Sequence, residues 1–184
     1  MAGKALEIVE SGRFLSEEFV LWLWKQGLTE GGTSGVDGDM TACFVDDSVK
    51  LVTERGDVKE VSLRKGNPAE SREAFEAMSR GMRVASAKLR LLSADMEWTF
   101  TINASTLDVS GMKMPPTQSK DPAGRLADRL FLAEEGLGHI ERRFGRFLDL
   151  RTADAEALET EINNWLKGGL VGEGGGGGEV PWEE

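Results

Sequence analysis

The most constraining feature of this 184-residue sequence is a set of seven apolar residues spaced alternately four and three positions apart. They are Leu126, Leu130, Ala133, Leu137, Ile140, Phe144 and Phe147. This spacing predicts one long helix with a single apolar seam, and Asp121-Pro122 supplies an N-cap followed by a proline in the first turn. We expect the helix, over residues 122–150, either to lie across the rest of the fold or to pair with a second copy as a coiled coil.

Two blocks of antiparallel strands precede this helix, and a helix precedes each block. Apolar and polar residues alternate strictly over residues 96–102, which predicts a half-buried strand. Weaker alternation predicts the other strands over residues 84–92, 107–110, 40–45, 49–52 and 58–63. Asp46-Asp47 and Arg55-Gly56-Asp57 are predicted to be the turns of the first block.

The helices before the strands are predicted from apolar periodicity and capping residues. The first covers residues 14–25 and ends near a Gly27 C-cap, and the second begins at an Asn67 N-cap and runs to about Ser79. A final helix is expected over residues 152–167, with Leu158, Ile162, Trp165 and Leu166 facing inward.

We therefore predict an α+β fold with two helix-plus-antiparallel-meander units in a pseudo-duplicated arrangement. The long C-terminal helix and the shorter final helix pack on these units. The two meanders either join into one sheet or form two. Residues 1–167 are expected to be a single domain, because a chain of this length has room for one sizeable core.

The C-terminal residues 168–184 are expected to be a disordered, glycine-rich acidic tail. The formal net charge is -10, from 22 basic and 32 acidic residues. Residues 152–184 contribute one basic and eight acidic residues, or -7, which leaves -3 for the remainder. The tail is either without a role or an acidic-aromatic docking peptide built on Val180, Pro181 and Trp182.

No catalytic or metal-binding motif is apparent. The only histidine, His139, lies within the long helix, and the only cysteine, Cys43, lies in a strand, so we expect a packed or surface imidazole and a buried thiol. We expect a non-enzymatic protein without a metal ion or small-molecule cofactor. The N-terminus has no apolar leader segment and no window could span a bilayer, which predicts a cytoplasmic protein that does not contact membranes.

Basic residues gather in two groups despite the acidic total. Arg80, Arg83, Lys88 and Arg90 form the first group, and Arg142, Arg143 and Arg146 on the long helix form the second. These groups are either a solvated face or a groove that follows a nucleic-acid backbone.

Several segments resemble the bacterial recombination-associated RdgC-type proteins. The resemblance is carried by Phe14 to Phe19 with Trp22-Leu23-Trp24, by residues 97–101 and 111–115, and by Asp121-Pro122 at the start of the long helix. It covers roughly residues 12–150 and its motifs are structural. It implies a non-enzymatic protein connected with DNA recombination, whose better-known relatives bind DNA without sequence preference as ring-shaped dimers.

Two functions are therefore expected. The first is a binding protein, recombination-associated, that contacts DNA or a DNA-bound protein through the seven basic residues of the two groups. The alternative is a protein–protein assembly module that uses the long helix, by self-association or with another protein, or the acidic tail, and binds no nucleic acid.

Overall fold

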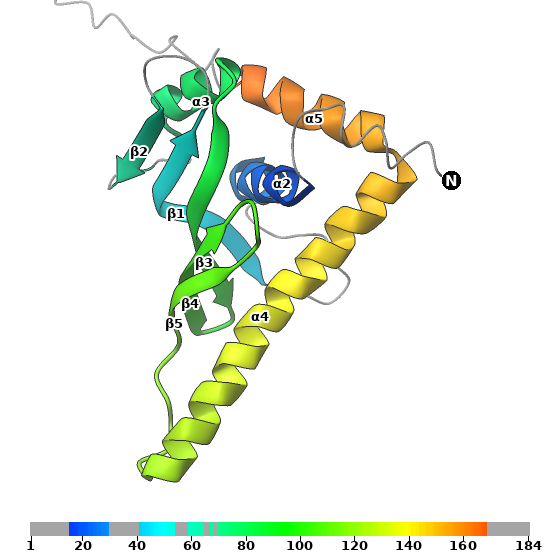
Figure 1. Ribbon diagram of the computed structural model, residues 1–184. Helices are drawn as coiled ribbons and strands as arrows, with labels where there is room; N and C mark the ends of the chain where they lie inside the picture. Colours follow the sequence, from blue (N-terminus) through cyan, green and yellow to red (C-terminus); the bar gives the residue numbers. More distant parts are fainter. Residues whose placement is uncertain (1–14, 30–40, 54–58, 65–66, 68–69, 169–184) are drawn as a thin grey trace, which may run out of the picture.

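A computed structural model describes residues 15–29, 41–53, 59–64, 67 and 70–168. Its strands are β1 (Ala42–Val52), β2 (Glu60–Arg64), β3 (Arg83–Ser93), β4 (Met96–Asn103) and β5 (Val109–Lys113). Its helices are α2 (Leu15–Thr29), α3 (Arg72–Ser79), α4 (Pro122–Ala153) and α5 (Ala155–Gly168). The α+β class, the long helix and the shorter final helix are confirmed, and the strands form one antiparallel sheet in the order β2-β1-β3-β4-β5 (Figure 1).

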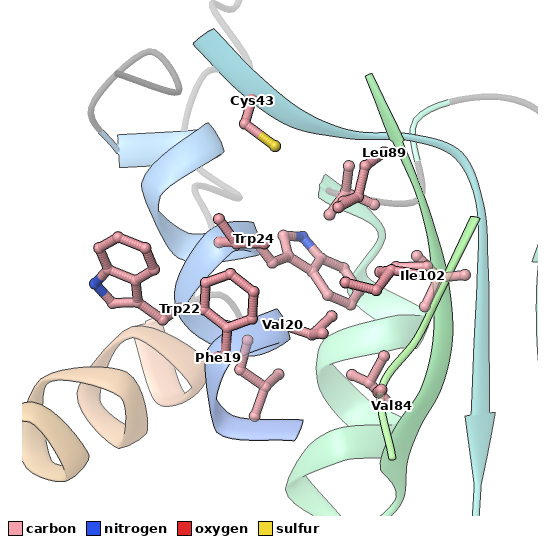
Figure 2. Packing of buried hydrophobic residues seen from close by; sticks show 14 of the residues in the cluster. Phe19, Val20, Trp22, Trp24, Cys43, Val84, Leu89 and Ile102 are labelled. Atoms are coloured by element: carbon pink, nitrogen blue, oxygen red, sulfur yellow. The ribbon is translucent and has the colours of Figure 1, made fainter. Parts of the chain in front are cut away.

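Helix α2 lies at the centre of the molecule. One side packs on β1 and β3, and other sides meet α4 and α5, so every residue from Glu17 to Gln26 is buried (Figure 1). Its aromatic side chains pack on different neighbours. The ring centroids of Trp22 and Phe147 of α4 lie 5.9 Å apart, and those of Trp24 and Trp165 of α5 lie 6.2 Å apart. Figure 2 shows the inner layer, where Trp24 and Val20 face Leu89 and Ile102 of the sheet. The dense aromatics of this segment are core residues, which explains why the helix is apolar on almost all sides.

Strand β1 corrects the prediction of two strands joined by a turn at Asp46-Asp47. The backbone continues as one strand, and its register against β3 shifts between Val45 and Val49, where β1 carries two more residues than its partner. An even insertion keeps the alternation in phase, so Val49 and Leu51 stay on the buried face with Cys43 and Val45. The acidic pair is therefore a bulge within a strand. The predicted turn at residues 55–57 lies outside the described residues.

Several predicted helix and strand ends are also wrong. Helix α2 continues through Gly27 to Thr29, and α3 begins at Arg72 with Ser71 at its N-cap instead of starting at Asn67. Leu107 has a φ of 61° in the turn after β4, so β5 begins later than predicted, at Val109. Helix α4 runs on to Ala153, and α5 follows from Ala155. The predicted N-cap of α4 is confirmed, because the Asp121 carboxylate accepts a hydrogen bond from the Gly124 N–H at 2.9 Å.

Helix α4 has two different halves. Its buried residues, Leu132, Gly136, His139, Ile140, Arg143, Phe147 and Arg151, begin beyond the first turns of the helix and continue to the last turn. The preceding residues 122–131 project beyond the sheet beside the segment that follows β5, and none of them is buried (Figure 1). Only Ile140 and Phe147 of the predicted seam are buried, because Gly136 and Arg143, which lie off that seam, face the fold. The helix thus crosses the fold with its C-terminal part alone.

Candidate functional site

The charges of the first predicted basic group have acidic partners. On β3, Lys88 Nζ lies 3.0 Å from Asp46 and 2.9 Å from Asp47 of the β1 bulge, and Arg90 lies 3.2 Å from Asp46. The hydrogen bond from Lys88 holds the pKa of the Asp47 carboxyl below its ordinary value, and the two aspartates raise the pKa of Lys88. Asp46 and Asp47, which the sequence predicts to be turn residues, therefore neutralise the positive charges on this face of β3.

The other two members of the first group also have carboxylates nearby. Arg83 lies 3.9 Å from Glu17 at the start of α2, and Arg80 lies 3.9 Å from Glu76 one turn earlier along the chain. The partner of Arg83 is far away in the sequence, so the pattern of charges along the chain did not indicate it. The first group is consequently a set of ion pairs on the fold surface rather than a run of unpartnered cations.

The second basic group does not converge on one surface. Arg143 is 1% exposed and donates hydrogen bonds to the carbonyl oxygens of Thr41 and His139. Arg142 is exposed and directs its guanidinium to His139 Nδ1 at 2.6 Å. Arg146 is exposed on the following turn. At about 100° per residue, Arg142 and Arg146 are four positions apart and share one exposed helix side, whereas the buried Arg143 points away from that side toward the fold.

His139 is part of this internal polar contact and is packed, as expected. Its Nδ1 lies 3.1 Å from Thr41 Oγ1, and its ring centroid lies 5.9 Å from that of Trp98. A guanidinium can only donate hydrogen bonds, so the contact with Arg142 makes Nδ1 an acceptor and assigns the proton of the neutral ring to Nε2. The histidine joins α4 to the beginning of β1.

Cys43 is the buried thiol that the sequence predicts. Desolvation raises the pKa of Cys43 to about 11, which keeps the sulfur protonated at neutral pH. In the described part of the chain, no three His, Cys, Asp or Glu side chains are grouped as metal ligands. Among the same residues, no helix combines the length and the apolar character needed to cross a bilayer.

The exposed apolar side chains were not predicted to gather, but they do. Leu126, Leu130, Phe131 and Leu137 are 61%, 64%, 64% and 41% exposed, and they are the large hydrophobic side chains left exposed in the described residues. Leu126, Leu130 and Phe131 lie on the projecting part of α4, and Leu137 lies further along, on the outer side of the packed part; we call these four residues the α4 apolar face. The seam spacing identified three of them, but it could not show that the body of the protein leaves them uncovered.

A groove lies next to this face, between the start of α4 and the end of β5 with the segment that follows it. It encloses about 710 Å³, and its walls include Lys113, Arg125 and Arg129 together with Met112, Met114 and Leu126. We call it the basic groove. Arg125 and Arg129 lie four positions apart on α4, but nothing in the sequence pattern places Lys113 beside them.

The predicted docking residues Val180, Pro181 and Trp182 lie outside the described residues. No known protein family matches this chain, and no curated protein matches it. The resemblance to RdgC-type proteins therefore stays a prediction that rests on the sequence segments alone.

Proposed function

We propose that this chain is a non-catalytic protein–protein assembly module whose docking surface is the α4 apolar face. One observation carries the proposal: Leu126, Leu130, Phe131 and Leu137 are exposed along a single helix, three of them on its projecting stretch. Covering the exposed part of each side chain would contribute about 1–2 kcal/mol, as a fraction of the roughly 1.5–3 kcal/mol gained by fully burying a leucine or phenylalanine. A helix or groove of a partner protein is the surface that such a row of side chains fits.

The charges support protein docking over DNA binding. Arg80, Arg83, Lys88 and Arg90 face carboxylates of the same chain, and Arg143 is buried. A phosphate backbone would have to displace those carboxylates, and this cost reduces the favourable release of counterions that drives DNA binding. The recombination setting remains a prediction from the resemblance to RdgC-type proteins.

The non-catalytic part of the proposal is supported by the causes of the pKa shifts. The pKa of Asp47, Glu60 and Lys88 shifts because each group has an oppositely charged partner, and that of Cys43 shifts because it is buried away from solvent. These are structural causes, whereas an active site combines perturbed groups in one accessible cleft.

Site-specific photo-crosslinking tests the docking surface even when the partner is unidentified. A benzophenone amino acid replaces Leu130 in one variant and the exposed Arg72 of α3 in a matched control, and adducts formed in cells are identified by mass spectrometry. We expect a protein adduct from position 130 that disappears when Leu126 and Leu137 are changed to Ser. An absence of adducts at position 130, or equal adducts from both positions, would show that the apolar face is not a docking surface.

Salt dependence separates this function from DNA binding. A gel-shift titration with duplex DNA at about 50 mM salt should show no complex that depends on Arg142 and Arg146. A complex that weakens steeply with salt and is lost in an Arg142→Ala, Arg146→Ala variant would favour the DNA-binding function instead.

A further inference from the structure

The basic groove combines unneutralised positive charge with an apolar floor. Lys113, Arg125 and Arg129 are exposed and have no ion-pair partner among the described residues. No described acidic residue lines the groove. This differs from the sheet and α3, where Lys50, Arg72, Arg80, Lys88 and Arg90 all face carboxylates. Three such cations over methionine, proline and leucine side chains fit a ligand that is both acidic and apolar.

We propose that the basic groove binds residues 179–183 of a second copy of this chain. This inference rests on the proposed assembly function and names the partner. The segment Glu179-Val180-Pro181-Trp182-Glu183 places three apolar residues between two carboxylates. Val180 and Trp182 would lie on Met112, Met114 and Leu126, while the glutamates would reach the three cations.

Charge complementarity favours this occupant. Residues 152–184 carry a net charge of -7, from one basic and eight acidic residues, so long-range attraction draws this part of one copy toward the groove of another. The indole of Trp182 supplies a large apolar area at a low cost in conformational entropy, and an arginine beside it adds a cation–π contact.

The distance along the molecule favours a second copy over the same copy. Helix α5 packs beside α3, where the ring centroids of Trp165 and Phe75 lie 5.2 Å apart. The residues that line the groove belong to the first turns of α4, and α5 follows the opposite end of that helix (Figure 1). The 32 residues of α4 alone extend about 48 Å. The 14 residues from Gly168 to Trp182 reach about 50 Å only when fully extended, and about 21 Å as a typical coil. Binding within one chain would therefore require an almost straight segment, which binding between copies does not.

The floor of the groove distinguishes a peptide from a nucleic acid. Single-stranded nucleic acids bind through aromatic side chains on which bases stack. The groove offers methionine, proline and leucine, and none of its described walls is aromatic. These side chains suit the valine, proline and tryptophan of the segment.

Peptide binding to the full-length chain tests the proposal directly. The protein carries Trp182→Ala so that its own segment does not compete, and the probe is a fluorescein-labelled peptide of residues 174–184, followed by anisotropy at about 50 mM salt. We expect saturable binding that weakens at least tenfold in an Arg129→Glu variant. Arg146→Glu is the matched control, since it reverses an exposed arginine elsewhere on α4 and should change the affinity less than twofold. A peptide with Val180 and Trp182 changed to Ser keeps the charge and should also lose at least tenfold.

Each alternative outcome overturns the proposal. It is wrong if the peptide does not bind at about 1 mM, if Arg129→Glu and Arg146→Glu weaken binding equally, or if the serine peptide binds as well as the native one. It is also wrong if a short single-stranded DNA binds through Arg129 more tightly than the peptide does. Crosslinking from position 130 distinguishes failure of this proposal from failure of the proposed assembly function. An adduct at position 130 without peptide binding would retain the assembly function with another partner. If neither an adduct nor peptide binding is observed, both proposals are wrong.

Discussion

Gly136 of α4 allows the helix to lie directly against Trp98 of β4. A Cβ at position 136 would lie 2.8 Å from Trp98 Cδ1 and 3.0 Å from Nε1, which is closer than side-chain carbons approach other atoms. The indole cannot retreat easily, because it is fully buried and its N–H donates a hydrogen bond to the Leu132 carbonyl at 2.8 Å. We predict that Gly136→Ala destabilises the protein, although alanine favours helix formation.

The magnitude follows from three contributions. Replacing glycine by alanine within a helix stabilises by about 1 kcal/mol. Forcing a methyl group into a filled contact costs about 1–3 kcal/mol, and loss of the buried hydrogen bond costs about 1 kcal/mol more. The net expectation for Gly136→Ala is a destabilisation of about 1–3 kcal/mol. Gly145 on the same helix has no atom within 4 Å of the position that a Cβ would take, so Gly145→Ala should stabilise by up to about 1 kcal/mol.

Urea unfolding followed by circular dichroism at 222 nm measures both variants against the unchanged chain. The two alanine substitutions should shift the midpoint in opposite directions, with a difference in unfolding free energy of about 1–4 kcal/mol. A Gly136→Ala protein that is as stable as Gly145→Ala would refute the close contact with Trp98. Tryptophan fluorescence provides a second measurement, because displacement of the indole should change the emission of the native state.

Three further predictions use buried or paired ionisable groups. Glu18 and Arg151 form a buried ion pair at 3.1 Å, so Arg151→Met should lower the unfolding free energy by about 3–5 kcal/mol, and adding Glu18→Leu should recover most of that loss in urea titrations. Burial raises the pKa of Cys43 to about 11, so the thiol of the unfolded chain ionises at a lower pH than the thiol of the folded protein. The unfolding free energy should therefore fall as the pH rises from about 9 toward 11, and Cys43→Ala should reduce that fall. The hydrogen bond from Lys88 lowers the pKa of Asp47, so the ionised carboxylate stabilises the fold at neutral pH. This stabilisation is lost as the pH falls through the folded-state pKa, and Asp47→Asn should therefore reduce the change in urea midpoint between about pH 5 and pH 3.

Each of these predictions has a result that contradicts it. An Arg151→Met variant within about 1 kcal/mol of the unchanged chain would mean that the pair is not buried as described. A profile that keeps its full alkaline loss after Cys43→Ala would assign that loss to other groups. An Asp47→Asn variant with the same acid sensitivity as the unchanged chain would show that Lys88 does not stabilise the ionised carboxylate.

Strictly periodic segments could be predicted from the sequence because their pattern is local. Strand β4 begins at the predicted residue and ends one residue beyond the predicted Ile102, since each apolar side chain in turn meets the core while its neighbour faces away. The capped start of α4 was likewise identified, because the Asp121 side chain bonds to a backbone group three residues later. Local pattern and local bonding agree at both places.

The β1 bulge could not be predicted, because its cause lies about 40 residues away. Asp46-Asp47 has the composition of a turn, but Lys88 and Arg90 of the neighbouring strand hold both carboxylates against an extended backbone. Because these aspartates are so far from Lys88 and Arg90 in the sequence, the ion pairs of these two basic residues could not be predicted either.

The candidate site could be predicted only in part. The spacing of Leu126, Leu130 and Leu137 identified an apolar helix face, but Phe131 is off that seam and Lys113 belongs to another element. Which half of a long helix is covered depends on where Trp98 and Arg143 dock, and apolar periodicity carries no information about that position.

The Trp98 hydrogen bond to the Leu132 carbonyl divides α4 into two regions of different opening free energy. From Leu132 onward, amide protons should exchange with solvent deuterons only when the core opens, because that part of the helix is packed against the fold. Residues 122–131 have no buried side chain, so their amides should exchange through local fraying at much lower cost. A ligand on this end would slow exchange there and leave the rest of the helix unchanged, so the backbone itself reports whether the projecting turns are occupied.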